Sequence, residues 1–88
     1  MVRVRGRFTM KLLNKVTAGD FEGVTYQTTL KGNVYYTFKV FYKVGKKKFC
    51  IDRSYVYLID PQYCYEKMKD AMDVAIGMRE NLLNWNID

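Results

Sequence analysis

Alternation of apolar and polar residues dominates the first part of the chain and predicts strands. In residues 2–12 the even positions are mostly apolar and the odd positions mostly basic, the period of a strand with one buried face. The same alternation runs through 21–30 and is clearest in 34–44. A fourth strand is expected from near Lys46, with a bulge near Arg53 where the phase becomes ambiguous.

Short polar or glycine-containing segments separate these strands. Residues 14–20 read as a loop, Lys31-Gly32-Asn33 as a tight turn, and Gly45 as a second turn. Connections of this length favour pairing of the strands in chain order. The predicted core face then carries these residues: Val24, Tyr26, Leu30, Val34, Tyr36, Phe38, Val40, Tyr42, Val44, Phe49 and Ile51.

The last third of the chain has a helical period. Asp60 followed by Pro61 is a strong helix start, an N-cap acid before a proline in the first turn. An apolar stripe follows at alternating spacings of four and three: Cys64, Met68, Ala71, Ala75, Met78, Leu82 and Trp85. Core packing against the sheet explains the stripe from Met68 to Met78.

Together these patterns predict an α+β fold, a four-stranded antiparallel sheet (β-β-β-β-α) packed by one long C-terminal helix. At 88 residues the chain has room for one domain, with the sheet in 1–59 and the helix in 61–86. A helix of about 25 residues is about 37 Å long, whereas four strands span about 19 Å across their axes. We therefore expect the end of the helix to pass the sheet edge and to contact a second subunit through Leu82, Leu83 and Trp85.

Charge is divided unevenly along the chain. Residues 1–53 hold twelve lysines and arginines against three acids, and residues 54–88 hold three against six. The predicted sheet is therefore basic and the predicted helix acidic. A basic surface attracts polyanions, which include nucleic acid, anionic membranes and acidic proteins.

The sequence lacks the common catalytic residues and motifs. The chain has no histidine, so the commonest general base and the usual nucleophile–histidine pairs are missing. No glycine-rich phosphate loop and no metal-ligand spacing is present. The sequence therefore predicts a protein that is not an enzyme and has no cofactor or metal.

The two cysteines, Cys50 and Cys64, form no CxxC motif and are expected to be free thiols in a cytoplasmic protein. No segment approaches the roughly 20 apolar residues of a membrane span, and no secretory signal is visible.

The non-core face of the predicted sheet combines cations with aromatic rings. Thr25, Gln27 and Thr29 are placed there, with no acid before Asp52. The candidate binding residues are Arg3, Arg5, Arg7, Lys11, Tyr35, Lys39, Phe41, Lys43, Lys46 and Lys48. Proteins that hold single strands pair a cationic track with rings on which bases stack. A solvated face with lysines that protect sheet edges is the alternative. Phe41 could also be covered by the N-terminal segment or by a second subunit.

The element order β-β-β-β-α with a proline near the helix start resembles the transcriptional-coactivator and Whirly-type single-strand-binding proteins. This resemblance implies dimers that hold nucleic acid on their sheets, and no residue role is carried over from it. A small oligonucleotide-binding barrel is a second candidate, although its usual helix between the third and fourth strands has no counterpart here.

The leading hypothesis is a homodimeric module that binds single-stranded DNA or RNA on the basic, aromatic face of its sheet. The alternative is a small interaction or inhibitor module, of the kind that phages and mobile elements encode, which docks an acidic protein through the same face. A third option is an accessory subunit whose Trp85 end inserts into a larger assembly.

Overall fold

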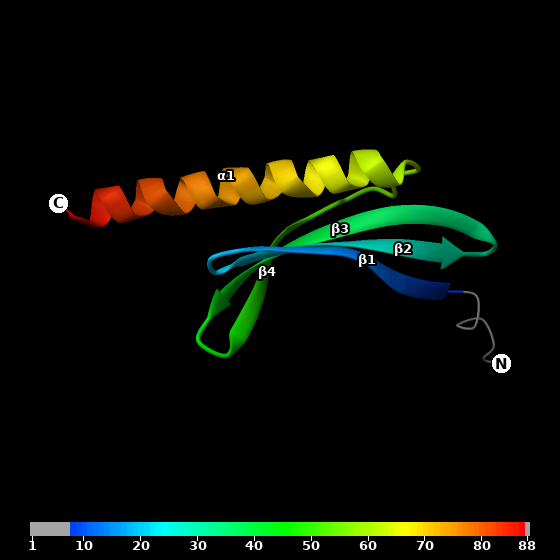
Figure 1. Cartoon of the computed structure of the whole chain (residues 1–88), viewed down its shortest axis with the longest axis horizontal. Helices are drawn as coiled ribbons and strands as arrows, with labels where there is room; N and C mark the ends of the chain where they lie inside the picture. The colour runs from blue at the N-terminus through cyan, green and yellow to red at the C-terminus, as the bar shows by residue number, and fades with distance from the viewer. Residues whose placement is uncertain (1–7, 88) are drawn as a thin grey trace.

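In the computed structural model, four antiparallel strands form one sheet and a long helix lies on one face of it (Figure 1). The structure describes the backbone of residues 8–87 and the side chains of residues 9–80. The elements are β1 (Phe8–Ala18), β2 (Phe21–Leu30), β3 (Asn33–Val44), β4 (Lys47–Arg53) and α1 (Pro61–Ile87). The strands lie in chain order, so the predicted α+β fold is confirmed.

Two-residue turns join the strands. Lys31 and Gly32 both have positive φ, 53° and 83°, which matches the twist of a tight hairpin. Gly45 also has a positive φ and turns the chain into β4, as predicted.

The predicted loop over 14–20 is wrong, because β1 continues to Ala18 and pairs with β2 as far as the turn at Gly19 and Asp20. A bulge at Leu13 shifts the register between Leu12 and Asn14 and so keeps this part of β1 in the sheet.

The helix begins where the sequence indicates. An Asp60 side-chain oxygen accepts a hydrogen bond from the Gln62 backbone N–H at 3.1 Å, which makes Asp60 the N-cap. Cys64, Met68 and Met72 face the sheet and are buried. They lie over the two central strands, β2 and β3.

Gly23 allows this close approach of helix and sheet. A Cβ at this position would collide with the sulfur atoms of Met68 and Met72. The absence of a side chain at Gly23 therefore leaves the space that the two methionines fill.

The predicted faces of β2 are reversed in the structure. Gly23 pairs with Val40 and Thr25 with Phe38, and directly opposite residues share a face. Thr25, Gln27 and Thr29 therefore lie on the helix side, and Val24, Tyr26 and Leu30 on the opposite side. Val24 and Thr25 are both buried, so hydrophobic alternation did not distinguish the two faces of this central strand.

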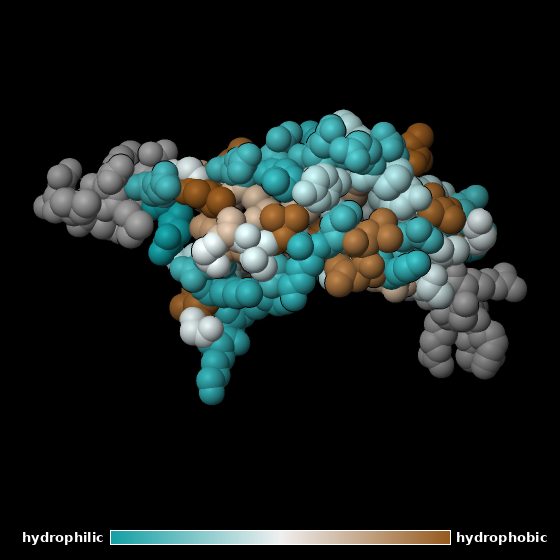
Figure 2. All heavy atoms as spheres, in the orientation of Figure 1, coloured by the Kyte–Doolittle hydropathy of each residue, from teal (hydrophilic) through white to brown (hydrophobic). Residues whose placement is uncertain are grey.

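The helix leaves the helix-side face of β4 uncovered. Phe49 and Ile51 were predicted to continue the core, but their side chains are 50% and 45% exposed, and Met78 of α1 is 60% exposed. α1 packs on β2 and β3, and its C-terminal end extends past the sheet (Figure 1). Figure 2 shows hydrophobic atoms in the band between the helix and the sheet.

A bulge interrupts β4 close to the predicted place. The register shifts between Val40 and Phe41 of β3, which leaves Ile51 without a partner. Beyond Arg53 the Ser54 hydroxyl accepts a hydrogen bond from the Phe38 backbone N–H at 3.2 Å, in place of a strand carbonyl. Pairing resumes at Leu58, which exchanges two backbone hydrogen bonds with Tyr36. Residues 55–57 therefore loop away from the ladder.

Candidate nucleic-acid interface

The sheet face opposite α1, called the outer face below, gathers about half of the predicted binding residues. Strand register places Tyr35, Lys39, Phe41 and Lys43 of β3 on it, and Lys48 of β4 lies directly opposite Lys43. These five side chains are half-buried or exposed. Lys46 lies in the turn between β3 and β4, and Arg3, Arg5 and Arg7 lie outside the described residues.

Lys11 does not belong to this face. It pairs with Gln27, which pairs with Tyr36, and Tyr36 packs against the core under the helix. The placement of Lys11 on the outer face is therefore wrong, because the faces of this part of β1 are also reversed. The apolar residues Met10 and Leu12 lie opposite Thr28 and Tyr26 of the outer face, and Lys11 lies on the helix side. Lys15 takes its place, since the bulge at Leu13 sets Lys15 opposite Val24 on the outer face.

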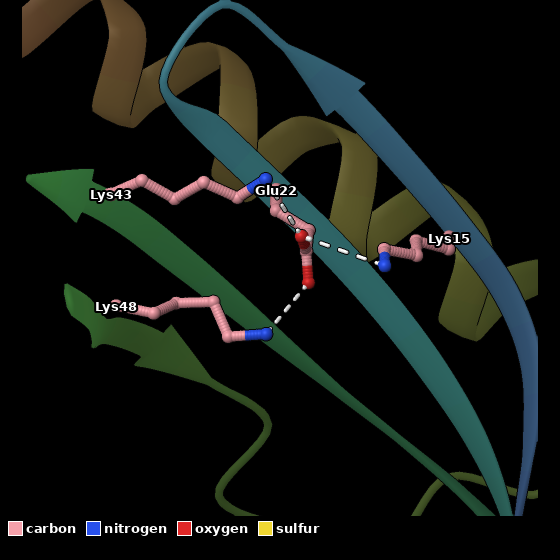
Figure 3. A network of polar contacts seen from close by, with 4 residues as sticks. All are labelled: Lys15, Glu22, Lys43 and Lys48. Atoms are coloured by element: carbon pink, nitrogen blue, oxygen red, sulfur yellow. Dashed lines mark hydrogen bonds and ion pairs between the residues drawn. The ribbon is translucent and has the colours of Figure 1, made fainter. Parts of the chain in front are cut away.

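Glu22 lies on the outer face, where the sequence predicted no acid before Asp52. It lies opposite Phe41 and is only 2% exposed. Three lysines from three different strands surround its carboxylate (Figure 3). The Lys48 and Lys43 ammonium groups lie 3.1 and 3.2 Å from its two oxygens, and that of Lys15 lies at 3.9 Å. One buried carboxylate therefore holds cations of β1, β3 and β4 close together.

Burial and the lysines act on the Glu22 pKa in opposite directions. Burial is the largest single influence and raises the pKa, because it disfavours the charged form. Hydrogen bonds from Lys48 and Lys43 and the charges of Lys48 and Lys15 together outweigh burial, and the pKa lies below its ordinary value. Glu22 is therefore an anion at neutral pH, and the cluster of one acid and three lysines keeps a net positive charge.

Phe41 is covered from within the chain. The Lys48 ammonium lies 4.7 Å from the centroid of its ring, a cation–π contact, and the side chain is half-buried. Covering by a second subunit is therefore not needed to explain a phenylalanine on this face.

The outer face also holds three functional candidates that the sequence did not indicate: Arg53, Tyr55 and Tyr57. Arg53 lies opposite Lys39 on the outer face. Its guanidinium is 5.9 Å from the ring centroid of Tyr55, which is 81% exposed. The Tyr57 ring stacks on that of Tyr35, with centroids 5.0 Å apart and planes at 29°. The alternation of Tyr55 and Tyr57 after Asp52 was the sequence signal for these tyrosines. It could not be assigned to a face of the sheet, because that assignment depends on the loop at 55–57.

A hollow of about 480 Å³ opens beside these tyrosines and is called the outer-face hollow below. Its lining includes Thr28, Lys39, Arg53, Ser54, Tyr55 and Tyr57. Both charged residues of the described lining are cations. The arrangement can hold an anionic, partly aromatic ligand by charge, stacking and hydroxyl contacts.

An apolar groove lies on the other side of the sheet. It has a volume of about 490 Å³ and runs between the C-terminal half of α1 and the uncovered part of the sheet, lined by Phe21, Tyr42, Ile51, Val74 and Met78 among others. The predicted oligomer contacts Leu82, Leu83 and Trp85 lie further along α1, and their side chains are outside the described residues.

The described residues include two thiols. Cys50 is an exposed free thiol and Cys64 a buried one, and burial raises the pKa of the Cys64 thiol to about 11. In the described part of the chain, no three His, Cys, Asp or Glu side chains come close enough to hold a metal ion. Within the same part, no helix has the length and apolar character needed to cross a membrane.

Comparison of the chain with protein-family models, curated proteins and solved structures finds no match. Function is therefore inferred from the chain's own residues.

Proposed function

We propose that this protein binds single-stranded nucleic acid on the outer face of its sheet. The observation that carries the proposal is the convergence of Lys15, Lys39, Lys43, Lys48 and Arg53 on the face that the helix leaves free. Exposed tyrosines border the same cations. A cationic track beside stacking rings is the usual composition of a single-strand site.

The charges and the rings have different tasks in this proposal. The lysines and Arg53 contact phosphates, so they supply affinity that depends on salt and is indifferent to sequence. Tyr55 and Tyr57 offer rings for base stacking, worth about 1–3 kcal/mol per base. Phe41 contributes less than these tyrosines, because its side chain is half-buried beneath Lys48, whereas Tyr55 and Tyr57 are 81% and 52% exposed.

Binding of a 20-nucleotide single strand, titrated from 50 mM salt upward, tests the proposal. Log affinity should fall with log salt at a slope of about −0.7 per phosphate contact. Lys39→Ala should weaken binding and flatten the slope by less than one unit. Tyr55→Ala should weaken binding with the slope nearly unchanged.

The helix offers a matched pair of controls. Lys67 lies 5.8 Å from the ring centroid of Tyr63 on α1, which resembles the pairing of Arg53 with Tyr55. Lys67→Ala and Tyr63→Ala should leave affinity and slope unchanged. The proposal is wrong if wild-type protein binds no 20-nucleotide single strand at 50 mM salt.

An acidic protein partner is the second candidate. Val56 and Ile59, beside the outer-face tyrosines in sequence, are 66% and 81% exposed, and exposed aliphatic side chains suit a protein contact better than a nucleic-acid contact. A pull-down with and without nuclease separates the two candidates. A partner retained after nuclease treatment, together with no affinity for oligonucleotides, would favour the protein partner.

We also propose that the chain forms a homodimer through the apolar groove and the end of α1. The groove is lined mainly by apolar side chains, and the helix that borders it continues to Ile87 with the apolar residues Leu82, Leu83 and Trp85 in its sequence. A second copy of α1 supplies apolar side chains that suit this groove.

The remaining parts of the proposal concern the kind of activity and the compartment. We propose that the protein acts by binding and not by catalysis, since the outer face offers cations and rings but no histidine. Two free thiols suit a reducing compartment, which supports the cytoplasm as its location.

A further inference from the structure

The floor of the outer-face hollow contains a polar group with no partner. Thr28 of β2 is 2% exposed and lines the hollow. Its hydroxyl is buried and makes no hydrogen bond among the described residues. A buried hydroxyl without a partner destabilises a fold, so an unsatisfied hydroxyl beneath a hollow points to a ligand that completes it.

The polar groups around Thr28 are rich in donors. Lys39 and Arg53 can only donate hydrogen bonds. The Ser54 hydroxyl already accepts one from the Phe38 backbone, which leaves its proton free to donate. None of the described lining residues is an aspartate or glutamate. The hollow therefore suits a ligand that presents acceptors.

Nucleobases differ in this respect. Thymine and uracil present the keto oxygen O4 and guanine presents the keto oxygen O6, whereas cytosine and adenine carry amino donors at these two positions. An amino group is a donor, so it would form no hydrogen bond with Lys39, Arg53 or the Ser54 hydroxyl proton, which are also donors. At about 480 Å³ the hollow has the size of a small-molecule site, which is ample for one base.

We propose that the outer-face hollow takes one base of the bound strand and selects a keto base over an amino base, with the Thr28 hydroxyl donating to the base. This inference rests on the proposed binding of single strands and adds base preference to it. Met10 and Tyr57 line the hollow and are about half exposed, so rotamer changes of these side chains are the movement needed to open its floor.

Oligodeoxyuridine and oligodeoxycytidine of 12 nucleotides provide the test, because they have the same sugar, phosphate and ring size and differ at the base edge. Wild-type protein should bind the deoxyuridine strand about fivefold more tightly or better, the effect expected of one hydrogen bond. The salt slopes of the two strands should be equal, since both make the same phosphate contacts. This comparison needs no variant.

Thr28→Val then tests the hydroxyl. Valine keeps the shape and suits a strand, so the variant should fold with an unchanged or higher melting temperature while its deoxyuridine preference falls below twofold. Thr28→Ser should keep the preference. Thr29→Val, the same change on the helix side of β2, should also keep it.

The possible failures are distinguishable. If neither strand binds, the proposed function fails and this inference fails with it. If both bind with equal affinity, single-strand binding stands and the inference is wrong. A deoxyuridine preference that survives in Thr28→Val would show that another group selects the base and would also overturn the inference.

Discussion

At the scale of single residues, Glu22 is the least expected feature of the outer face. Its carboxylate is buried where a binding surface would be expected to carry only cations, and it holds three lysines within 3.9 Å. These lysines are about half exposed, so they remain accessible to phosphates. Glu22 therefore stabilises the fold and at the same time weakens the field that attracts a polyanion.

Glu22→Gln should move stability and binding in opposite directions. The glutamine keeps the shape but loses charge-assisted hydrogen bonds, so we expect a loss of about 1–2 kcal/mol in the free energy of unfolding at pH 7. Affinity for a single strand should rise and its salt slope should steepen, by up to about 0.7 for each lysine released. Weaker binding by a folded variant would show instead that Glu22 holds the lysines in their binding positions.

The same substitution should alter how stability depends on pH. The folded-state pKa of Glu22 lies below the ordinary value of 4.5, so its contribution to stability is present in full above that pH. It is lost as the pH falls through the folded-state pKa. The difference in stability between wild type and Glu22→Gln, measured by denaturation at a series of pH values below 7, should therefore shrink as the pH falls.

The two thiols should react at very different rates. Cys50 is exposed, whereas Cys64 is fully buried, and its pKa is raised to about 11 by burial, so Cys64 is protonated at neutral pH. Mass spectrometry after brief alkylation at pH 8 should find one modified cysteine in the native protein and two after unfolding. A two-dalton deficit with no alkylation would reveal a disulfide, and rapid double modification would show that Cys64 is accessible.

At the scale of elements, the sequence predicts boundaries better than faces. The turns at Lys31-Gly32 and Gly45 and the N-cap at Asp60 follow from residue types with strong local preferences, and the structure has them. The faces of β2 depend on what packs above and below the strand, and buried residues occur on both of its sides. The faces of the first half of β1 are reversed in the same way, which is why Lys11 was misplaced. Glu22, Arg53 and Tyr57 were not predicted as site residues, because their positions depend on register and on two bulges.

Two glycine substitutions should test the contact between helix and sheet with opposite results. Gly23→Ala places a methyl group against Met68 and Met72, so overpacking should destabilise the fold by about 1–3 kcal/mol. Gly77 lies in α1 with nothing within 4 Å of an added Cβ. Gly77→Ala should therefore stabilise the fold by up to about 1 kcal/mol. Urea denaturation measures both, and equal effects of the two substitutions would contradict the close packing at Gly23.

At the scale of the whole molecule, apolar surface remains after the fold is complete. Phe49 and Ile51 of β4 and Val74 and Met78 of α1 are all exposed, and three of these four border the apolar groove. The principal extents of the chain are 57, 27 and 18 Å, an elongated shape with much surface for its size. Association of two copies would cover the surface that α1 leaves bare.

We expect a dimer at micromolar concentration, detected by sedimentation as twice the chain mass. Trp85→Asp and Ile51→Asp should each shift the equilibrium toward monomer, since a charge in an apolar contact is costly. Tyr55→Asp, the same kind of change on the outer face, should leave the dimer intact. A wild-type monomer at about 100 μM, where a contact of about −8 kcal/mol is nearly saturated, would exclude the dimer.

The order of the elements also determines when each surface is covered as the chain folds. Adjacent strands close over two-residue turns, so the sheet forms from contacts between near neighbours and loses little loop entropy. Docking of α1 is different, because it joins residues as distant in the chain as Gly23 and Met72. During synthesis, Phe38 and Val40 therefore emerge before the helix that buries them, and chains halted before Pro61 expose that apolar face to one another, which favours aggregation.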